Sequence, residues 1–196
     1  MDESSLGFNN ADISISKEKD TTYTTSNSFE SQTPISESLQ THIINSIVSN
    51  LNDIIIENQQ RLNNNIWKDN VFYLDQIPPI SLENYIQHLV KYTNMNISTL
   101  ILSIIYIDKF CEELKYVLNY NNIHRLLLIS VFISLKYNED KMVNTKLYAD
   151  IAGVCVEDLK MLEYLVCTKL DFKFYVSSDL YQLYYNYFIN QLRKEN

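Results

Sequence analysis

Apolar residues recur at helical spacing along most of the chain. From Leu39 to Leu62 they stand three and four positions apart, which predicts one long amphipathic helix, and we place it at residues 36–66. Residues 1–35 instead hold single hydrophobic residues scattered among Ser, Thr, Asn, Asp and Glu. Such a segment buries too little apolar surface to offset the entropy of ordering, so we expect a disordered, acidic and polar tail there.

Five further helices are predicted after a linker over residues 67–79. The linker ends at Pro78 and Pro79, where a helix cannot readily continue. The predicted helices are separated by short polar breaks and begin near Ser81, Ile97, Asn122, Thr145 and Val156. The third of them is apolar almost all round, which is typical of a helix at the centre of a bundle. We therefore expect one folded unit, with its main entry at these two prolines.

A closing helix rich in tyrosine is expected within residues 177–196, with Ser177 as its N-terminal cap. The β-rich stretch at residues 171–176 is short and isolated, so no sheet is predicted. The sequence as a whole predicts an all-α fold.

The negative charge of the chain is concentrated near its start. The formal net charge is -8, and residues 1–60 hold nine acidic residues against two lysines. Because no basic stripe is present, we expect no nucleic acid partner, and protein partners are favoured. The longest apolar runs, at residues 100–107 and 126–135, are shorter than the ~20 residues that cross a bilayer, so no membrane association is expected.

The residue types that usually carry chemistry form no motif. The two glycines, Gly7 and Gly153, are far apart, which argues against a phosphate-binding loop. The histidines lie on different predicted helices without ligand spacing; they are His42, His88 and His124. We therefore expect no catalytic residues, no metal site and no cofactor, and an enzyme is disfavoured. Three cysteines without a CxxC pair and no signal peptide pattern favour an intracellular location, in the nucleus, the cytoplasm or both.

About half of the chain, residues 80–176, resembles the P/U-type cyclins, which are related to a phosphate-signalling cyclin. Five stretches carry the resemblance together, in order and at the family's spacing. They are ISLENYIQHLVKYT (80–93), IIYIDKF (104–110), NIHRLLLISVFISLKYNED (122–140), NTKLYADIAGV (144–154) and LKMLEYLVCTKLDFKFYVS (159–177). The resemblance implies a single five-helix cyclin box, preceded by an N-terminal helix and followed by a short C-terminal helix.

The resemblance also implies a function and two residues that carry it. A P/U-type cyclin binds and activates a cyclin-dependent protein kinase as a heterodimer, and Lys136 and Glu163 match the pair that holds the kinase's C-helix. The residues themselves leave a local interpretation open. Lys136 can serve the C-terminal dipole of its own helix, and Glu163, on an apolar stripe, can pair locally. The alternative function is a cyclin-fold adaptor or transcription scaffold that activates no kinase.

Two further pairs of residues are singled out by the resemblance. Glu139 and Asp140 keep the family's acidic pair, and form either a kinase-contact loop or a solvated loop. The family usually has Arg at the position of His88, where it pairs with the Asp matched by Asp108. We therefore expect a structural pair between His88 and Asp108, because a carboxylate surrounded by apolar residues needs a partner.

Overall fold

The computed structural model describes residues 37–61, 71–140 and 142–191. Within them the chain forms seven helices and no strand, which confirms the all-α prediction. The helices are α1 (Glu37–Arg61), α2 (Leu82–Thr93), α3 (Ile97–Leu114), α4 (Ile123–Asn138), α5 (Thr145–Ala152), α6 (Val156–Lys169) and α7 (Ser178–Asn190). The predicted tail, residues 67–70 of the predicted linker, and positions 36 and 62–66 of the first predicted helix lie outside the described residues.

Local polar residues decide where several helices begin and end. The side chains of Ser81, Asn144 and Ser177 each accept a hydrogen bond from a backbone N–H three positions later, at 3.0–3.3 Å. These caps satisfy backbone donors that lack a partner in the first turn. Gly153 ends α5 in the left-handed conformation, with φ of 76°, which glycine adopts without a steric cost.

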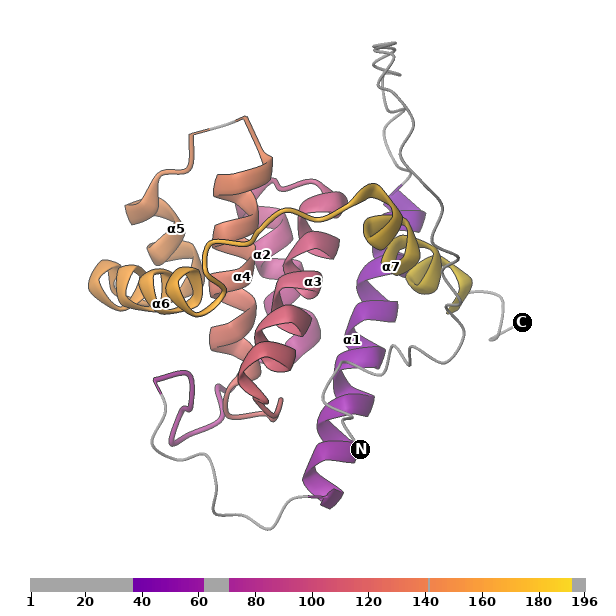
Figure 1. Ribbon diagram of the computed structural model, residues 1–196, viewed down its shortest axis with the longest axis horizontal. Coiled ribbons are helices and arrows are strands. Elements are labelled where there is room, and N and C mark those ends of the chain that lie inside the picture. The colour runs from indigo at the N-terminus through magenta and orange to yellow at the C-terminus, as the bar shows by residue number, and fades with distance from the viewer. Residues whose placement is uncertain (1–36, 62–70, 141, 192–196) are drawn as a thin grey trace.

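Helices α3 and α4 form the centre of the molecule. They pack against each other, with α5 and α6 on one side of them and α1 and α7 on the other (Figure 1). Between Ile123 and Leu135 every side chain of α4 except that of Arg125 is buried. The predicted central position of this helix is therefore confirmed.

Helix α1 buries a single stripe of apolar side chains. Its fully buried residues are Ile43, Ile47, Leu51 and Ile55, and the helix packs on α2 and α7 (Figure 1). The spacing of this stripe is that of one face of a helix, as the sequence predicts. The N-terminal helix thus belongs to the folded body of the protein.

The predicted pair between His88 and Asp108 is wrong. His88 Nε2 lies 2.8 Å from the carbonyl oxygen of Ile151, at the end of α5, whereas Asp108 accepts a hydrogen bond from the hydroxyl of Tyr184 on α7. The reason is the order of packing. Helix α2 packs on α1, α4 and α5, while α3 packs on α4, α6 and α7, so the two side chains face different neighbours.

Candidate protein-binding groove

Lys136 and Glu163 meet at the surface of the bundle. Lys136 is in the last turn of α4, Glu163 is in the middle of α6, and these two helices pack together. Lys136 Nζ lies 2.5 Å from Glu163 Oε1, and the two side chains are 44% and 23% exposed. An ion pair this close to solvent contributes about 0–1 kcal/mol, so both groups can exchange partners at low cost. The two residues singled out by the sequence are therefore adjacent.

The ion pair borders a shallow apolar groove. The groove has a volume of about 250 Å³ and is lined by Ile133, Lys136, Tyr137, Glu163, Cys167, Phe172 and Phe174. Lys136 Nζ also lies 5.1 Å from the centre of the Phe132 ring, which holds the ammonium group over an aromatic face. The arrangement combines one positive group, one negative group and an apolar floor, which suits the side chains and backbone of a protein partner.

A turn with unusual backbone geometry forms one end of the groove. Asp171 and Phe172 have φ of 50° and 56°, the left-handed region in which residues other than glycine are uncommon. Each such residue costs on the order of 1 kcal/mol. Hydrogen bonds from Phe172 N to Cys167 O (2.9 Å) and from Lys173 N to Leu170 O (2.9 Å) hold the turn in place. The turn leaves the Phe172 ring 65% exposed at the edge of the groove.

The segment after this turn is fixed to α3 by two side chains. The Tyr106 hydroxyl donates to the carbonyl oxygen of Phe174 at 3.0 Å, and Lys109 Nζ donates to that of Tyr175 at 2.9 Å. Phe174 is buried, whereas the Tyr175 ring is 75% exposed. The segment therefore presents its aromatic residues alternately to the core and to solvent.

Two large aromatic side chains of the groove reach the surface. Tyr137, on α4, is 55% exposed, and Phe172, after α6, is 65% exposed. Single exposed hydrophobic residues are ordinary on a protein surface, but two rings beside one apolar groove add apolar area that a partner can cover. We refer to the groove and its lining residues as the α4–α6 surface.

Cys167 lies on the wall of the groove, one turn after Glu163. Burial raises the pKa of its thiol, and the negative charge of Glu163 raises it further, while Lys136 acts in the opposite direction. Cys167 is therefore a neutral thiol at neutral pH and adds to the apolar lining of the groove.

Glu139 has a structural role that the sequence did not indicate. Its Oε1 accepts hydrogen bonds from Asn96 N (3.2 Å) and Thr99 Oγ1 (2.7 Å), at the first turn of α3. Asn96, the N-cap residue of α3, makes no side-chain cap bond of its own. Glu139 therefore caps α3 from the end of α4, while Asp140 is exposed.

Several groove residues were missed by the sequence analysis. Tyr137 directly follows Lys136, and Cys167 stands four positions after Glu163, so a search one helical turn around the predicted pair would have found both. Phe172 and Phe174 lie in the short stretch that resembled an isolated strand. Phe172 is exposed and Phe174 is buried, and both line the groove without forming a strand.

The part of the chain that the structure describes has no group of three or more His, Cys, Asp or Glu side chains that could hold a metal ion. Over the same residues, no helix is both long enough and apolar enough to cross a membrane.

Comparisons with known proteins point to one family. The profile of the Cyclin family matches residues 8–174. Cyclin-U2-1 of Arabidopsis thaliana is 27% identical over 146 residues, which cover 72% of this chain and 66% of the relative. Cyclin-U4-3 of the same plant is 34% identical over 53% of this chain and 45% of the relative. Cyclin-P3-1 of Oryza sativa subsp. japonica is 26% identical over 65% of this chain and 55% of the relative. The matches thus span less than two thirds of the length of these relatives.

Proposed function

Because the chain belongs to the cyclin family, we propose that it is the regulatory subunit of a cyclin-dependent protein kinase and activates that kinase by fixing its C-helix in the active position. The observation that carries this proposal is the Lys136–Glu163 ion pair at the edge of the apolar groove. Under the proposal, the folded unit that binds the kinase is the helical body that includes α1 and the cyclin box.

The contacts follow from the chemistry of the two charged groups. Lys136 has three N–H donors and suits backbone carbonyl oxygens of the kinase helix, whereas the Glu163 carboxylate suits backbone N–H groups and polar side chains. The groove between α4, α6 and the turn at Phe172 then accepts an apolar side chain of the same kinase segment. Burial of that side chain supplies affinity, and the two charges fix the orientation of the kinase helix.

Activation follows from a shift of population. A kinase whose C-helix samples active and inactive positions is driven toward the active one by a partner that binds only that position. The active position completes the Lys–Glu ion pair of the kinase's own active site. Under this proposal the kinase performs all of the chemistry, and this protein supplies differential binding alone.

The proposal is tested with the double variant Lys136→Ala plus Glu163→Ala. A kinase captured from the source cells with the wild-type chain is purified, and its peptide phosphorylation is measured with and without each variant. We expect a loss of affinity of at least about 100-fold and a matching loss of activation, because the variant removes two charged groups and each charge-assisted hydrogen bond contributes about 1.5–3 kcal/mol. The circular dichroism melt is expected to stay close to that of wild type, since the ion pair is partly exposed.

The matched control is Glu157→Ala plus Lys160→Ala. Both residues also lie on α6 and are exposed, but they do not line the groove. Their substitution removes one charge of each sign, as the test variant does. Full activation by a folded Lys136→Ala, Glu163→Ala variant would sink the proposal. Kinase binding by wild type without any rise in phosphorylation would favour the adaptor or scaffold function.

A further inference from the structure

Two walls of the groove come from parts of the chain that are far apart in the sequence. Lys136 and Tyr137 stand in the last turn of α4, whereas Phe172 and Phe174 lie in the segment after α6. The rings of Tyr137 and Phe174 face each other across 5.8 Å between their centres. The width of the groove therefore depends on what holds the segment after α6 at this distance from the end of α4.

One buried hydroxyl group on α3 joins the two walls. The Tyr106 side chain has no exposed area, and its hydroxyl donates to the carbonyl oxygen of Phe174 at 3.0 Å. The same hydroxyl accepts a hydrogen bond from Asn138 Nδ2 at 3.2 Å. Asn138 is the last residue of α4 and stands two positions after Lys136. A single tyrosine thus contacts the end of one wall and the backbone of the other.

Further contacts tie the end of α4 to the core. Asn138 Nδ2 also lies 3.0 Å from the carbonyl oxygen of Ser134. The Ser134 hydroxyl in turn donates to the carbonyl oxygen of Thr99, on α3, at 2.9 Å. On the other wall, the Tyr106 ring packs edge-on against that of Phe174, with 5.5 Å between their centres. Both walls are therefore held from α3 and not only by each other.

The turn before Phe174 needs such support. Asp171 and Phe172 have left-handed backbone angles, which residues other than glycine keep only where the surrounding structure fixes them. Two side chains of α3, Tyr106 and Lys109, anchor the chain two to four residues after these positions. Removal of the Tyr106 hydroxyl takes away one of these anchors and lets the turn relax.

We propose that Tyr106 is a positioning residue for the kinase partner, whose hydroxyl sets the width of the groove without contacting the partner. This inference rests on the proposed function, since the groove is where the kinase segment binds under that proposal. Tyr106 does not line the groove, so its effect acts through Asn138 and Phe174. A groove that is held at its bound width loses no binding free energy to ordering its own wall.

Tyr106→Phe tests the proposal, with Tyr85→Phe as its matched control. Each substitution keeps the ring and removes one hydroxyl. Tyr85 is also buried, and its hydroxyl donates to the carbonyl oxygen of Ala152 at 3.2 Å, outside the groove. We expect Tyr106→Phe to raise about tenfold the concentration that half-activates the captured kinase, a difference of ~1.4 kcal/mol, with unchanged activity at saturation. Tyr85→Phe should change neither quantity, although it also lowers the midpoint of urea unfolding.

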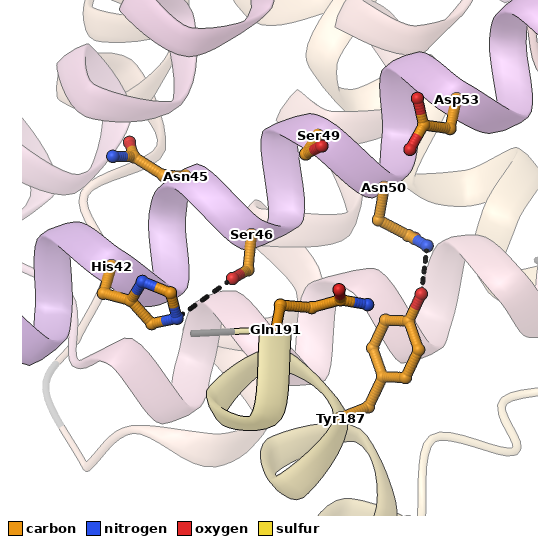
Figure 2. A pocket seen from close by; sticks show the side chains of 8 residues that line it. All are labelled: His42, Asn45, Ser46, Ser49, Asn50, Asp53, Tyr187 and Gln191. Carbon is orange, nitrogen blue, oxygen red and sulfur yellow. Dashed lines mark hydrogen bonds between the residues drawn. The ribbon is translucent and has the colours of Figure 1, made fainter. Parts of the chain in front are cut away.

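A second pair of residues controls for the bond between asparagine and tyrosine. Figure 2 shows Asn50 of α1 donating through Nδ2 to the Tyr187 hydroxyl of α7, at 2.9 Å, and Asn138 makes the same kind of bond to Tyr106. Asn138→Ala should weaken kinase binding less in the Tyr106→Phe background than in wild type, because the two residues act through one network. Asn50→Ala plus Tyr187→Phe should leave the affinity unchanged, since neither residue lines the groove.

Hydrogen exchange in the free chain gives a measurement that needs no kinase. The amides of Phe172 and Lys173 both donate hydrogen bonds within the left-handed turn. We expect them to exchange about tenfold faster in Tyr106→Phe than in wild type, and at the wild-type rate in Tyr85→Phe.

Three outcomes would overturn the inference and leave the proposed function standing. The first is equal affinity of wild type and Tyr106→Phe for a kinase that wild type activates. The second is an equal loss of affinity in Tyr106→Phe and Tyr85→Phe, which would mean that the hydroxyl acts through general stability alone. The third is unchanged exchange at Phe172 and Lys173 in Tyr106→Phe. Failure of wild type to bind or activate any kinase would overturn the proposed function, and this inference with it.

Discussion

Two acidic residues on apolar helix faces show how depth decides the role of a charged side chain. Asp108 is 8% exposed and accepts a hydrogen bond from the Tyr184 hydroxyl inside the bundle. Burial raises the pKa of the Tyr184 hydroxyl, so Tyr184 keeps its proton and remains the donor. Glu163 is 23% exposed and is paired with Lys136 in a weak ion pair. The first residue is committed to the fold, whereas the second is available to a partner.

The histidine that lies deepest is expected to make stability depend on pH. His124 is 5% exposed, and burial lowers the pKa of its imidazole below its ordinary value of 6.5, although backbone hydrogen bonds act in the opposite direction. The unfolded chain therefore takes up a proton at a higher pH than the folded chain does. The contribution of His124 is full above the unfolded pKa near ~6.5, and it is lost as pH falls from there toward the folded pKa.

The comparison of wild type with His124→Gln isolates this effect. Gln can still donate to the carbonyl oxygen of Ile80, which lies 3.2 Å from His124 Nε2, but it does not titrate. Wild type should lose more free energy of unfolding than the variant between about pH 7.5 and pH 5, by up to ~1.4 kcal/mol for each unit by which the pKa is lowered. Urea melts at each pH measure the difference. Equal losses in the two proteins would contradict a lowered pKa for His124.

At the scale of helices, contacts from distant residues decide how elements are joined. The sequence predicted a loop at Glu139 and Asp140, but Glu139 reaches back to the first turn of α3. This contact ties the end of α4, which carries Lys136, to its central neighbour. No local pattern could reveal it, because Glu139 and the start of α3 are far apart in the sequence. Asn96 is also a usual N-cap residue, so the sequence gives no reason to look for a second cap.

Substitutions at Glu139 and Asp140 should therefore differ in their effect on stability. Glu139→Ala is expected to lower the free energy of unfolding by about 0.5–2 kcal/mol, because it removes a cap. Glu139→Gln keeps an acceptor oxygen and should lose less, since only the interaction of the charge with the helix dipole disappears. The exposed Asp140→Ala is the matched control and should change the melt by less than about 0.5 kcal/mol. A melt of Glu139→Ala equal to that of Asp140→Ala would show that the cap contributes nothing to stability.

At the scale of the whole molecule, the sequence predicted where the helices lie along the chain better than which helices pack against each other. The starts of α3 and α5 agree with the prediction because Asn96 and Asn144 directly precede them, and asparagine favours the N-cap position. The pair at Lys136 and Glu163 came from family resemblance and lies together. By contrast, the partner of His88 depends on which helix α2 packs against, and hydrophobic periodicity does not encode that choice.

The turn at Asp171 and Phe172 was also beyond the reach of sequence patterns. Asp171 is of a type that adopts the left-handed conformation more often than most, but Phe172 is not, and nothing in the sequence indicates two such residues in a row. Tertiary hydrogen bonds from Tyr106 and Lys109 hold the following segment instead. The shape of the candidate groove therefore depends on packing between α3 and the segment after α6, which only the folded chain brings together.

The packing order of the helices makes a last prediction about which parts of the molecule open first. Helix α4 is buried on all sides from Leu126 to Leu135, and α3 packs against α4, α6 and α7. Helix α1 packs mainly on α2 and α7 and buries one stripe, so it can separate while the central pair stays folded. Native-state hydrogen exchange should then show the slowest amides in α3 and α4, with opening free energies equal to the global value from urea melts. Amides at the buried stripe of α1, such as those of Ile47 and Leu51, should exchange at least about tenfold faster, a difference of ~1.4 kcal/mol. Equal protection in α1 and α4 would mean that the N-terminal helix is inseparable from the cyclin box and unfolds with it as one cooperative unit.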